Sequence, residues 1–151
     1  MYKRIKDLRE DHDLTQKDIS NYLNVYRSTY AKWEDGNNKI PLLMLDKLSI
    51  KYNVSIDYML SLSNIKKDYV IKPLNTALFL LRLKQERKNK NLSQLYIANI
   101  LNLTKSTYNK YELGIVIPSI DKIITLAKFY KVSIDYLLGK KDGRITKQDN
   151  N

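Results

Sequence analysis

Two short segments, residues 27–34 and 105–112, carry the residues whose types and spacing suit chemistry on a macromolecule. In an α-helix, positions i, i+1, i+4 and i+5 lie on one face. In each segment this face combines cations with a hydroxyl and a small or amide side chain; its members are Arg27, Ser28, Ala31 and Lys32 in the first segment and Lys105, Ser106, Asn109 and Lys110 in the second. A short helix with such a face fits the major groove of DNA, where it can contact base edges.

The two faces predict different base contacts. The guanidinium of Arg27 can donate two parallel hydrogen bonds to O6 and N7 of guanine, a geometry that the ammonium of Lys105 matches less well. Asn109 can pair with adenine, whereas its counterpart Ala31 can only place a methyl group against the methyl of thymine. The sequence therefore predicts two base-contacting helices with unequal preferences.

The composition excludes most kinds of catalytic and metal site. The chain has no cysteine and a single histidine, His12, which leaves no thiol nucleophile, disulfide, iron–sulfur cluster or histidine-rich metal centre. The sequence contains no glycine-rich phosphate loop, spaced carboxylate pair or nucleophile–base set. We therefore expect a protein that is not an enzyme and that uses no cofactor or metal. No ligand-binding domain is evident, so a small-molecule effector is not indicated.

Charge and hydropathy favour an intracellular protein with a polyanionic partner. The 151 residues include 27 Lys and Arg against 16 Asp and Glu, a formal net charge of +11. No apolar run approaches the roughly 18 residues of a membrane span, and residues 1–7 lack the apolar stretch of a signal peptide. We expect a cytoplasmic, nucleoid-associated protein with no membrane contact.

The positive charge is unevenly divided along the chain. Residues 1–75 hold 13 basic and 10 acidic side chains, a net +3, whereas residues 76–151 hold 14 and 6, a net +8. Non-specific attraction to phosphates is therefore expected mainly from the C-terminal half.

An internal repeat divides the chain into two units. Residues 14–61 align without a gap with residues 92–139, and 20 of these 48 positions are identical. The repeat predicts an N-terminal domain over residues 1–62, a linker over 63–75, a C-terminal domain over 76–139 and a flexible basic tail over 140–151.

Within each copy the periodicity and the caps predict five helices and no strand. Thr15 with Asp18 is typical of a capping box at the start of the second helix, and Ser55 is expected to cap the fifth. Asn24 is suited to a left-handed turn between the second and third helices. Thr76 is the expected cap of the first helix of the second copy. The predicted fold class is all-α.

The motifs L-[ST]-Q, S-T-Y-x-K-[WY]-E-x-G and V-S-I-D-Y, each present twice, resemble a known family. The chain is similar to the Cro/repressor type of helix-turn-helix DNA-binding domain, the lambda-repressor-like fold of the XRE family, in tandem duplication. The resemblance implies that the third helix of each copy enters the major groove. It also makes the V-S-I-D-Y region a candidate dimer surface.

The resemblance further implies roles for residues outside the third helix. Gln16 and Gln94 would each contact a DNA phosphate and brace the recognition helix. Arg9 with Glu34, and Arg87 with Glu112, would form half-buried ion pairs that are structural. At the cap position of the third helix, Thr104 is expected to contact a phosphate, and its counterpart Tyr26 either does the same or packs against the protein.

Several positions depart from the family pattern. The usual turn glycine is replaced by Asn24 in one copy and by Asn102 in the other. The loop position after the glutamate, often a phosphate contact in the family, is acidic Asp35 in the first copy and apolar Leu113 in the second. These departures argue against equal DNA affinity of the two copies.

Two functions remain open from the sequence. The first is a sequence-specific transcriptional regulator, by expectation a repressor, whose partner is double-stranded DNA; monomer and homodimer both remain open for it. The second is a protein-interaction or dimerisation module in which one or both copies no longer contact DNA.

Overall fold

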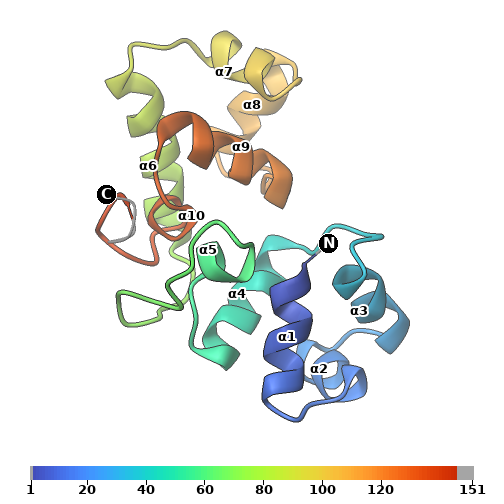
Figure 1. The fold of residues 1–151 in the computed structure, drawn as a ribbon. Helices are drawn as coiled ribbons and strands as arrows, with labels where there is room; N and C mark the ends of the chain where they lie inside the picture. Colours follow the sequence, from blue (N-terminus) through green and yellow to red (C-terminus); the bar gives the residue numbers. More distant parts are fainter. Residues whose placement is uncertain (1, 146–151) are drawn as a thin grey trace.

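The computed structural model of the chain describes residues 2–145, and all regular structure in that range is helical. The first copy contains α1 (Lys3–Asp11), α2 (Gln16–Leu23), α3 (Arg27–Glu34), α4 (Leu42–Tyr52) and α5 (Ile56–Met59), and the second contains α6 (Thr76–Asn89), α7 (Gln94–Ile100), α8 (Lys105–Glu112), α9 (Ile120–Tyr130) and α10 (Ile134–Leu137). The predicted all-α fold with five helices in each copy is confirmed. In Figure 1 the copies lie one above the other, with α5 and α10 between them. No helix in the described range is both long and apolar enough to cross a membrane.

Side-chain caps determine where several of the short helices begin. Thr15 accepts a hydrogen bond from the amide of Asp18, whose carboxylate in turn accepts from the amide of Thr15, which completes the predicted capping box of α2. Ser93 and Thr104 accept amide hydrogen bonds at the starts of α7 and α8. Asn24 has φ 56° and ψ 50°, the left-handed conformation expected for the turn between α2 and α3.

Buried apolar side chains in each copy fix the position of its third helix. The side chains that join the helix-turn-helix unit to the fourth helix are at most 1% exposed; they are Ile19, Leu23, Tyr30, Leu45 and Leu48 in the first copy and Ile97, Leu101, Tyr108, Ile123 and Leu126 in the second. Because such cores are close-packed, α3 and α8 are held rigidly against their own domains.

Glu86 replaces an apolar core residue of the first copy. Its counterpart Leu8 is buried in α1, and Glu86 is equally buried in α6. Tyr136 donates a hydrogen bond to the Glu86 carboxylate at 3.1 Å, and Arg144 pairs with both of its oxygens. The second copy thus fills this position with a paired carboxylate, which satisfies a charge that would otherwise be costly to bury.

The second copy extends past its predicted end at residue 139. The amide of Ser133 donates to the carbonyl of Arg144 at 2.7 Å, just as the amide of Ser55 donates to the carbonyl of Lys66 at 2.7 Å. Both loops therefore return over the start of the last helix of their copy. The repeat of the fold therefore reaches Arg144, beyond the end of the aligned sequences at residue 139.

The structure differs here from the flexible tail predicted for residues 140–151. Lys140 is fully buried and its ammonium is ion-paired with Asp46, while Lys141 lies 3.2 Å from the carboxylate of Asp68. A buried ammonium with a carboxylate partner is held in place, because leaving it unpaired is costly. The prediction is wrong for residues 140–145, and residues 146–151 lie outside the described range.

The connection between the copies, expected as a linker over residues 63–75, is tied to both of them. The amide of Leu74 donates to both carboxylate oxygens of Asp46 in α4, each at 3.1 Å. The next amide, of Asn75, donates to the carbonyl of Leu138 in the second copy at 3.1 Å. The Asn75 side chain, rather than the predicted Thr76, caps α6 by accepting from the amide of Leu78.

The last helices of the two copies cap each other. The carboxylate of Asp57 accepts the amides of Ile134 and Asp135 at 3.0 and 3.1 Å. The carboxylate of Asp135 accepts the amides of Ile56 and Asp57 at 3.1 and 2.9 Å. Each aspartate thus satisfies the free amides at the start of the other copy's helix. The contact uses the same residues on both sides, which is the property of a two-fold interface.

Candidate nucleic-acid interface

The two helix-turn-helix units, α2 with α3 and α7 with α8, lie at opposite ends of the molecule in Figure 1. Each third helix begins after the predicted turn, which places the N-terminal residues of the helix at the surface. The ring side of each helix faces inward, since Tyr30 and Tyr108 are fully buried and Trp33 and Tyr111 nearly so. The opposite side of each helix is therefore the one that is open to a partner.

On the open side, the structure exposes three of the four predicted base-contacting residues in each copy. Arg27, Ser28 and Lys32 are exposed on α3, and Lys105, Ser106 and Lys110 are exposed on α8, whereas Ala31 and Asn109 are half-buried. The amide nitrogen of Gln94 donates to Oδ1 of Asn109 at 3.0 Å. This bond orients the Asn109 side chain and leaves its NH2 group as the free donor.

A hydrogen-bonded network joins the third helix of the first copy to α1 and to the start of α2. Arg9 donates from Nε to Glu34 Oε1 at 2.6 Å and from Nη2 to Oε2 at 3.2 Å. Gln16 donates from Nε2 to the same Oε2 at 3.0 Å, and Arg9 also donates to the carbonyl of Leu14 at 2.8 Å. The glutamine therefore contacts the recognition helix directly and braces it.

The second copy repeats this network. Arg87 donates to the two Glu112 oxygens at 2.6 and 3.0 Å, and Gln94 donates to Glu112 Oε2 at 3.0 Å. Burial acts to raise the pKa of each glutamate, but the hydrogen bonds from arginine and glutamine outweigh it, and the pKa values of Glu34 and Glu112 are lowered. Both glutamates are thus held as carboxylates at neutral pH.

The residues predicted to contact phosphates lie in two places, at the starts of the third helices and at the start of α2. Tyr26 is 84% exposed, so its ring does not pack against the protein. Thr104 is exposed, and its hydroxyl oxygen accepts the amide of Thr107 at 3.1 Å, so it also caps α8. Gln16 and Arg27 line one concavity of about 480 Å³ at the start of α2. Free amides and cations at a helix start favour an anion.

One residue of this concavity, Lys17, was missed by the sequence reasoning. It lies in the first turn of α2 and is exposed beside Gln16 and Arg27. Its place directly after the bracing glutamine is the sequence signal that could have identified it. The second copy has Leu95 at this position, so the anion-favouring concavity of the first copy gains one cation that the second copy lacks.

The loop after the third helix differs strongly between copies. In the second copy it is apolar and open, with Leu113 58%, Ile115 66% and Ile117 53% exposed. The first copy has polar Asp35 and Asn37 at the corresponding first two positions. Neither set contains a cation at the position after the glutamate, so neither copy has a charged phosphate contact there.

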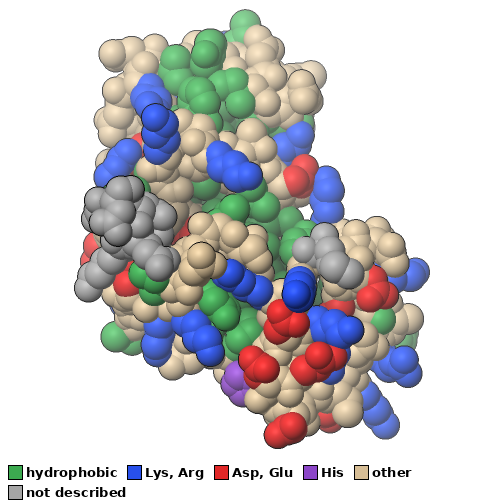
Figure 2. Space-filling view, in the orientation of Figure 1, with side chains coloured by type: hydrophobic (Ala, Val, Ile, Leu, Met, Phe, Trp, Pro, Cys, Tyr) green, Lys and Arg blue, Asp and Glu red, His purple; other side chains and the backbone are tan. Residues whose placement is uncertain are grey.

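The charge distribution also differs between the copies on the face shown in Figure 2. Acidic side chains gather at the lower right, over the first copy, and a hydrophobic patch covers part of the upper end, over the second. This view agrees with the smaller net charge of the first half of the chain. The first copy thus carries the arginine of the predicted base-contacting faces but the smaller net positive charge.

A helix-turn-helix family model matches the chain twice, over residues 5–59 and 83–137, so each match covers the helix-turn-helix unit and its supporting helices. No solved structure gives a significant match.

Curated relatives match a segment of the chain that is about as long as one copy. An uncharacterized HTH-type transcriptional regulator of Bacillus subtilis, YobD, is 41% identical over 61 residues, which are 40% of this chain and 54% of that protein. The B. subtilis HTH-type transcriptional regulator AnsR is 40% identical over 65 residues, 43% of this chain and 56% of that protein. The cryptic phage CTXphi transcriptional repressor RstR of Vibrio cholerae is 33% identical over 69 residues, 46% and 62% of the respective chains.

The chain thus spans little more than half the length of the first of these relatives. The double match of the family model covers more than half of the chain itself, and it falls on the two five-helix copies described above. The protein belongs to the helix-turn-helix family of the XRE type and carries two copies of its domain in one chain.

Proposed function

We propose that the chain is a sequence-specific DNA-binding transcriptional regulator, and specifically a repressor, whose two copies act as the two halves of a dimer. The observation that carries this proposal is the reciprocal capping between Asp57 and Asp135, which joins the copies through equivalent residues. Relatives named as transcriptional regulators and as a phage repressor support the regulatory role. A cytoplasmic, nucleoid-associated location follows from this function.

The proposed base contacts come from the exposed face of each third helix. Arg27 would donate both of its terminal nitrogens to a guanine in one half-site, and Lys105 would make a single, less directional contact in the other. The brace from Gln94 supports an adenine contact by Asn109, because it fixes the amide plane before DNA binds. Two different half-sites are therefore expected.

The proposed phosphate contacts lie at the starts of α2 and α3 and of α7 and α8. Gln16 with Lys17, and Gln94 in the second copy, would receive a phosphate beside the free amides of their helices. Tyr26 and Thr104 would each donate a hydroxyl to the next phosphate along the strand. These contacts position the recognition helices and carry no sequence preference.

The symmetry of the interface leads to a proposal for the symmetry of the operator. An interface in which residue i contacts j and j contacts i is generated by a two-fold axis. Two recognition helices related in this way face half-sites of opposite direction, spaced about 34 Å apart on one face of the duplex. The operator would therefore be an imperfect inverted repeat, read by one chain.

Selection of bound sequences from a random duplex pool by the full chain tests this function. The expected result is enrichment of a two-part motif whose halves point in opposite directions and differ in sequence. Arg27→Ala and Lys105→Ala form a matched pair of variants, and each should relax the base preference in a different half of the motif. Absence of enrichment at any salt concentration would refute the proposal and favour a protein-interaction module.

A further inference from the structure

The loop after the recognition helix of the second copy exposes a run of apolar side chains. Four of them are between 42% and 66% exposed; they are Leu113, Ile115, Val116 and Ile117. The four equivalent positions of the first copy are all polar; they are Asp35, Asn37, Asn38 and Lys39. The two copies thus present opposite kinds of surface beside equivalent helices.

The fold does not require apolar residues in this loop. The amide of Val116 donates to the carbonyl of Lys110 at 3.3 Å, and the equivalent amide of Asn38 donates to the carbonyl of Lys32 at 3.1 Å. The first copy therefore forms the same turn from polar residues. Exposed apolar surface that the fold does not need marks a contact with another molecule.

The apolar loop borders a groove between the copies. Residues 39–43 at the start of α4 and 117–120 at the start of α9 line a groove of about 300 Å³. Leu43, which is 47% exposed, and Ile117, which is 53% exposed, both lie in it. Leu43 therefore extends the apolar surface of the loop onto the first copy.

The loop is already ordered before any partner binds. Gly114 has φ 72°, and a Cβ added to it would lie 2.7 Å from Cδ1 of Leu80 in α6, so the turn packs closely against that helix. The amides of Ile115 and Val116 both donate to the carbonyl of Lys110. An ordered surface loses little conformational entropy when it binds.

The charges in the groove are paired across the junction of the copies. Nζ of Lys39 lies 2.9 Å from Oδ2 of Asp121, and residues 113–117 contain no charged side chain. The net charge of +11 makes two chains repel each other in general, but Asp121 neutralises the groove lysine here. This surface therefore suits a second chain better than a polyanion.

The area is sufficient for a weak dimer. The five apolar side chains of the loop and of Leu43 present on the order of 500 Å² of surface, near the largest patch of a typical monomer. Two such surfaces in contact would bury about 1,000 Å², the lower limit of a specific interface. Because the exposed loop adjoins a groove that it does not fill, a two-fold contact can place the loop of each chain in the groove of the other.

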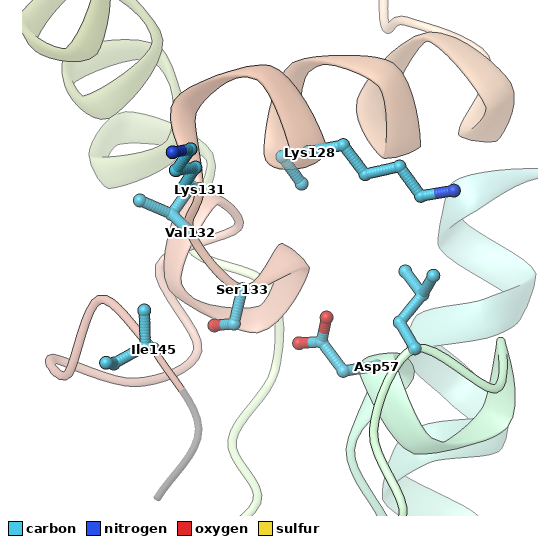
Figure 3. Close-up of a pocket in the computed structure, with 8 residues that line it drawn as sticks. Asp57, Lys128, Lys131, Val132, Ser133 and Ile145 are labelled. Atoms are coloured by element: carbon cyan, nitrogen blue, oxygen red, sulfur yellow. The ribbon is translucent and has the colours of Figure 1, made fainter. Parts of the chain in front are cut away.

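Another hollow at the junction of the copies does not suit such a contact. It has a volume of about 370 Å³, and Figure 3 shows charged side chains around it, with the Asp57 carboxylate below and the ammonium groups of Lys128 and Lys131 on opposite sides. Covering these charges with an apolar surface would be costly. The groove between α4 and α9 is therefore the surface that fits a second chain.

We propose that two chains associate reversibly through this surface when no DNA is bound, with Leu113 and Ile115 of each chain in the groove of the other. Each loop that lines the groove leads from the third helix of its copy, so the groove lies between α3 and α8 (Figure 1). A duplex in contact with both helices must cross this surface. The dimer and the DNA complex therefore exclude each other, a consequence that rests on the proposed function.

Sedimentation velocity of the full chain without DNA tests the contact. We expect a monomer–dimer equilibrium at micromolar chain concentrations, and a dimer that persists in about 0.5 M NaCl, because salt screens charges but not apolar contacts. A dimer that is lost at this salt concentration would overturn the proposal. A chain that stays monomeric up to about 1 mM would also overturn it and would leave a different protein as the occupant of the surface.

A matched pair of variants locates the contact. Ile115→Asn introduces the residue that the first copy carries at this position, so the loop should still fold, and dimerisation should weaken about tenfold. Ile50→Asn is the control, because Ile50 is also exposed but lies in the last turn of α4, away from the groove at its start. Unchanged dimerisation of Ile115→Asn, or an equal loss in both variants, would contradict the proposal.

Addition of the selected operator tests the exclusion of DNA. We expect the dimer to convert into complexes of one chain on one duplex, and a complex of two chains on one operator would contradict the exclusion. The dimer itself is measured without DNA, so a failure of this inference is distinguishable from a failure of the proposed function.

Discussion

The carboxylates of Asp57 and Asp135 each accept two backbone amides at the start of the other's helix. The two copies are therefore joined by an interface that is symmetric in its residues although it lies within a single chain. Burial first, and then the charge of Asp135, raise the pKa of Asp57 well above its ordinary value. The interface thus contains two acids in close contact, held by helix amides.

This arrangement predicts a stability that rises on mild acidification. For an acid whose pKa is raised in the folded state, the stabilising contribution is complete at pH values below the unfolded-state pKa, which is near 3.8 for Asp57. The contribution is lost as the pH rises through the folded-state pKa. We expect the melting temperature to rise between pH 7 and pH 5, and Asp57→Asn to flatten this rise.

The pH range in which acidification stabilises the protein is limited at its acidic end. Glu34 and Glu112 have lowered pKa values, so their stabilising contribution disappears as pH falls below about 4.5, their ordinary value. The comparison is therefore made above pH 5. An equal slope in the unsubstituted chain and in Asp57→Asn would show that the interface carboxylates do not control the effect.

The ion pair between Arg9 and Glu34 predicts a large loss on removal of the glutamate. Glu34→Ala would leave the buried Arg9 guanidinium without its main partner, at a cost of about 3 kcal/mol in the free energy of unfolding. Urea unfolding measures this loss. Glu10→Ala is the matched control, because Glu10 is an exposed partner of the same arginine and should cost less than about 1 kcal/mol. Similar losses for the two variants would contradict a structural role of Glu34.

Much of the fold follows from local sequence. The capping box of Thr15 and Asp18 and the left-handed Asn24 depend on residues that are neighbours in the chain, so their patterns carry the prediction. The pairing of Arg9 with Glu34 follows the family resemblance rather than any local pattern. The exposed faces of α3 and α8 follow from helical spacing alone, although contact of those faces with DNA remains a prediction.

The features that the sequence did not predict depend on contacts between distant residues or on hydrogen bonds between backbone atoms. The loops that end the two copies share the contacts Ser55–Lys66 and Ser133–Arg144, but both contacts join main-chain atoms and leave no side-chain pattern. The burial of Lys140 depends on Asp46, 94 residues away. A polar run such as residues 140–145 therefore resembles a free tail until its partners are known.

The contacts of residues 140–145 predict that truncation destabilises the second copy. A chain that ends at Gly139 loses the partner of Asp46 and the arginine that pairs with buried Glu86. We expect it to lose about 3 kcal/mol or more in the free energy of unfolding, relative to a chain that ends at Ile145. Equal stability of the two truncated chains, measured by urea unfolding, would argue against this account of residues 140–145.

The exposed lysines of α8 predict a change in base preference as well as in affinity. Replacing Lys105 and Lys110 together with alanine should cost about 1–3 kcal/mol of discrimination for each base contact that is lost. Lys84→Ala with Lys88→Ala removes the same charge from α6 and should weaken binding to all sequences alike. The assignment of α8 as a recognition helix would be wrong if both double variants kept the same base preference.

The central claim is that one chain holds two recognition helices in a fixed two-fold arrangement, and operator spacing tests it most directly. Affinity of the full chain is measured for its selected operator and for the same operator lengthened at its centre by five base pairs, about half a helical turn. If the two recognition helices are held in a fixed arrangement, the affinity should fall to that of a single half-site, because the second half-site is then rotated to the far face of the duplex. Unchanged affinity would contradict the account and would indicate two copies that move independently.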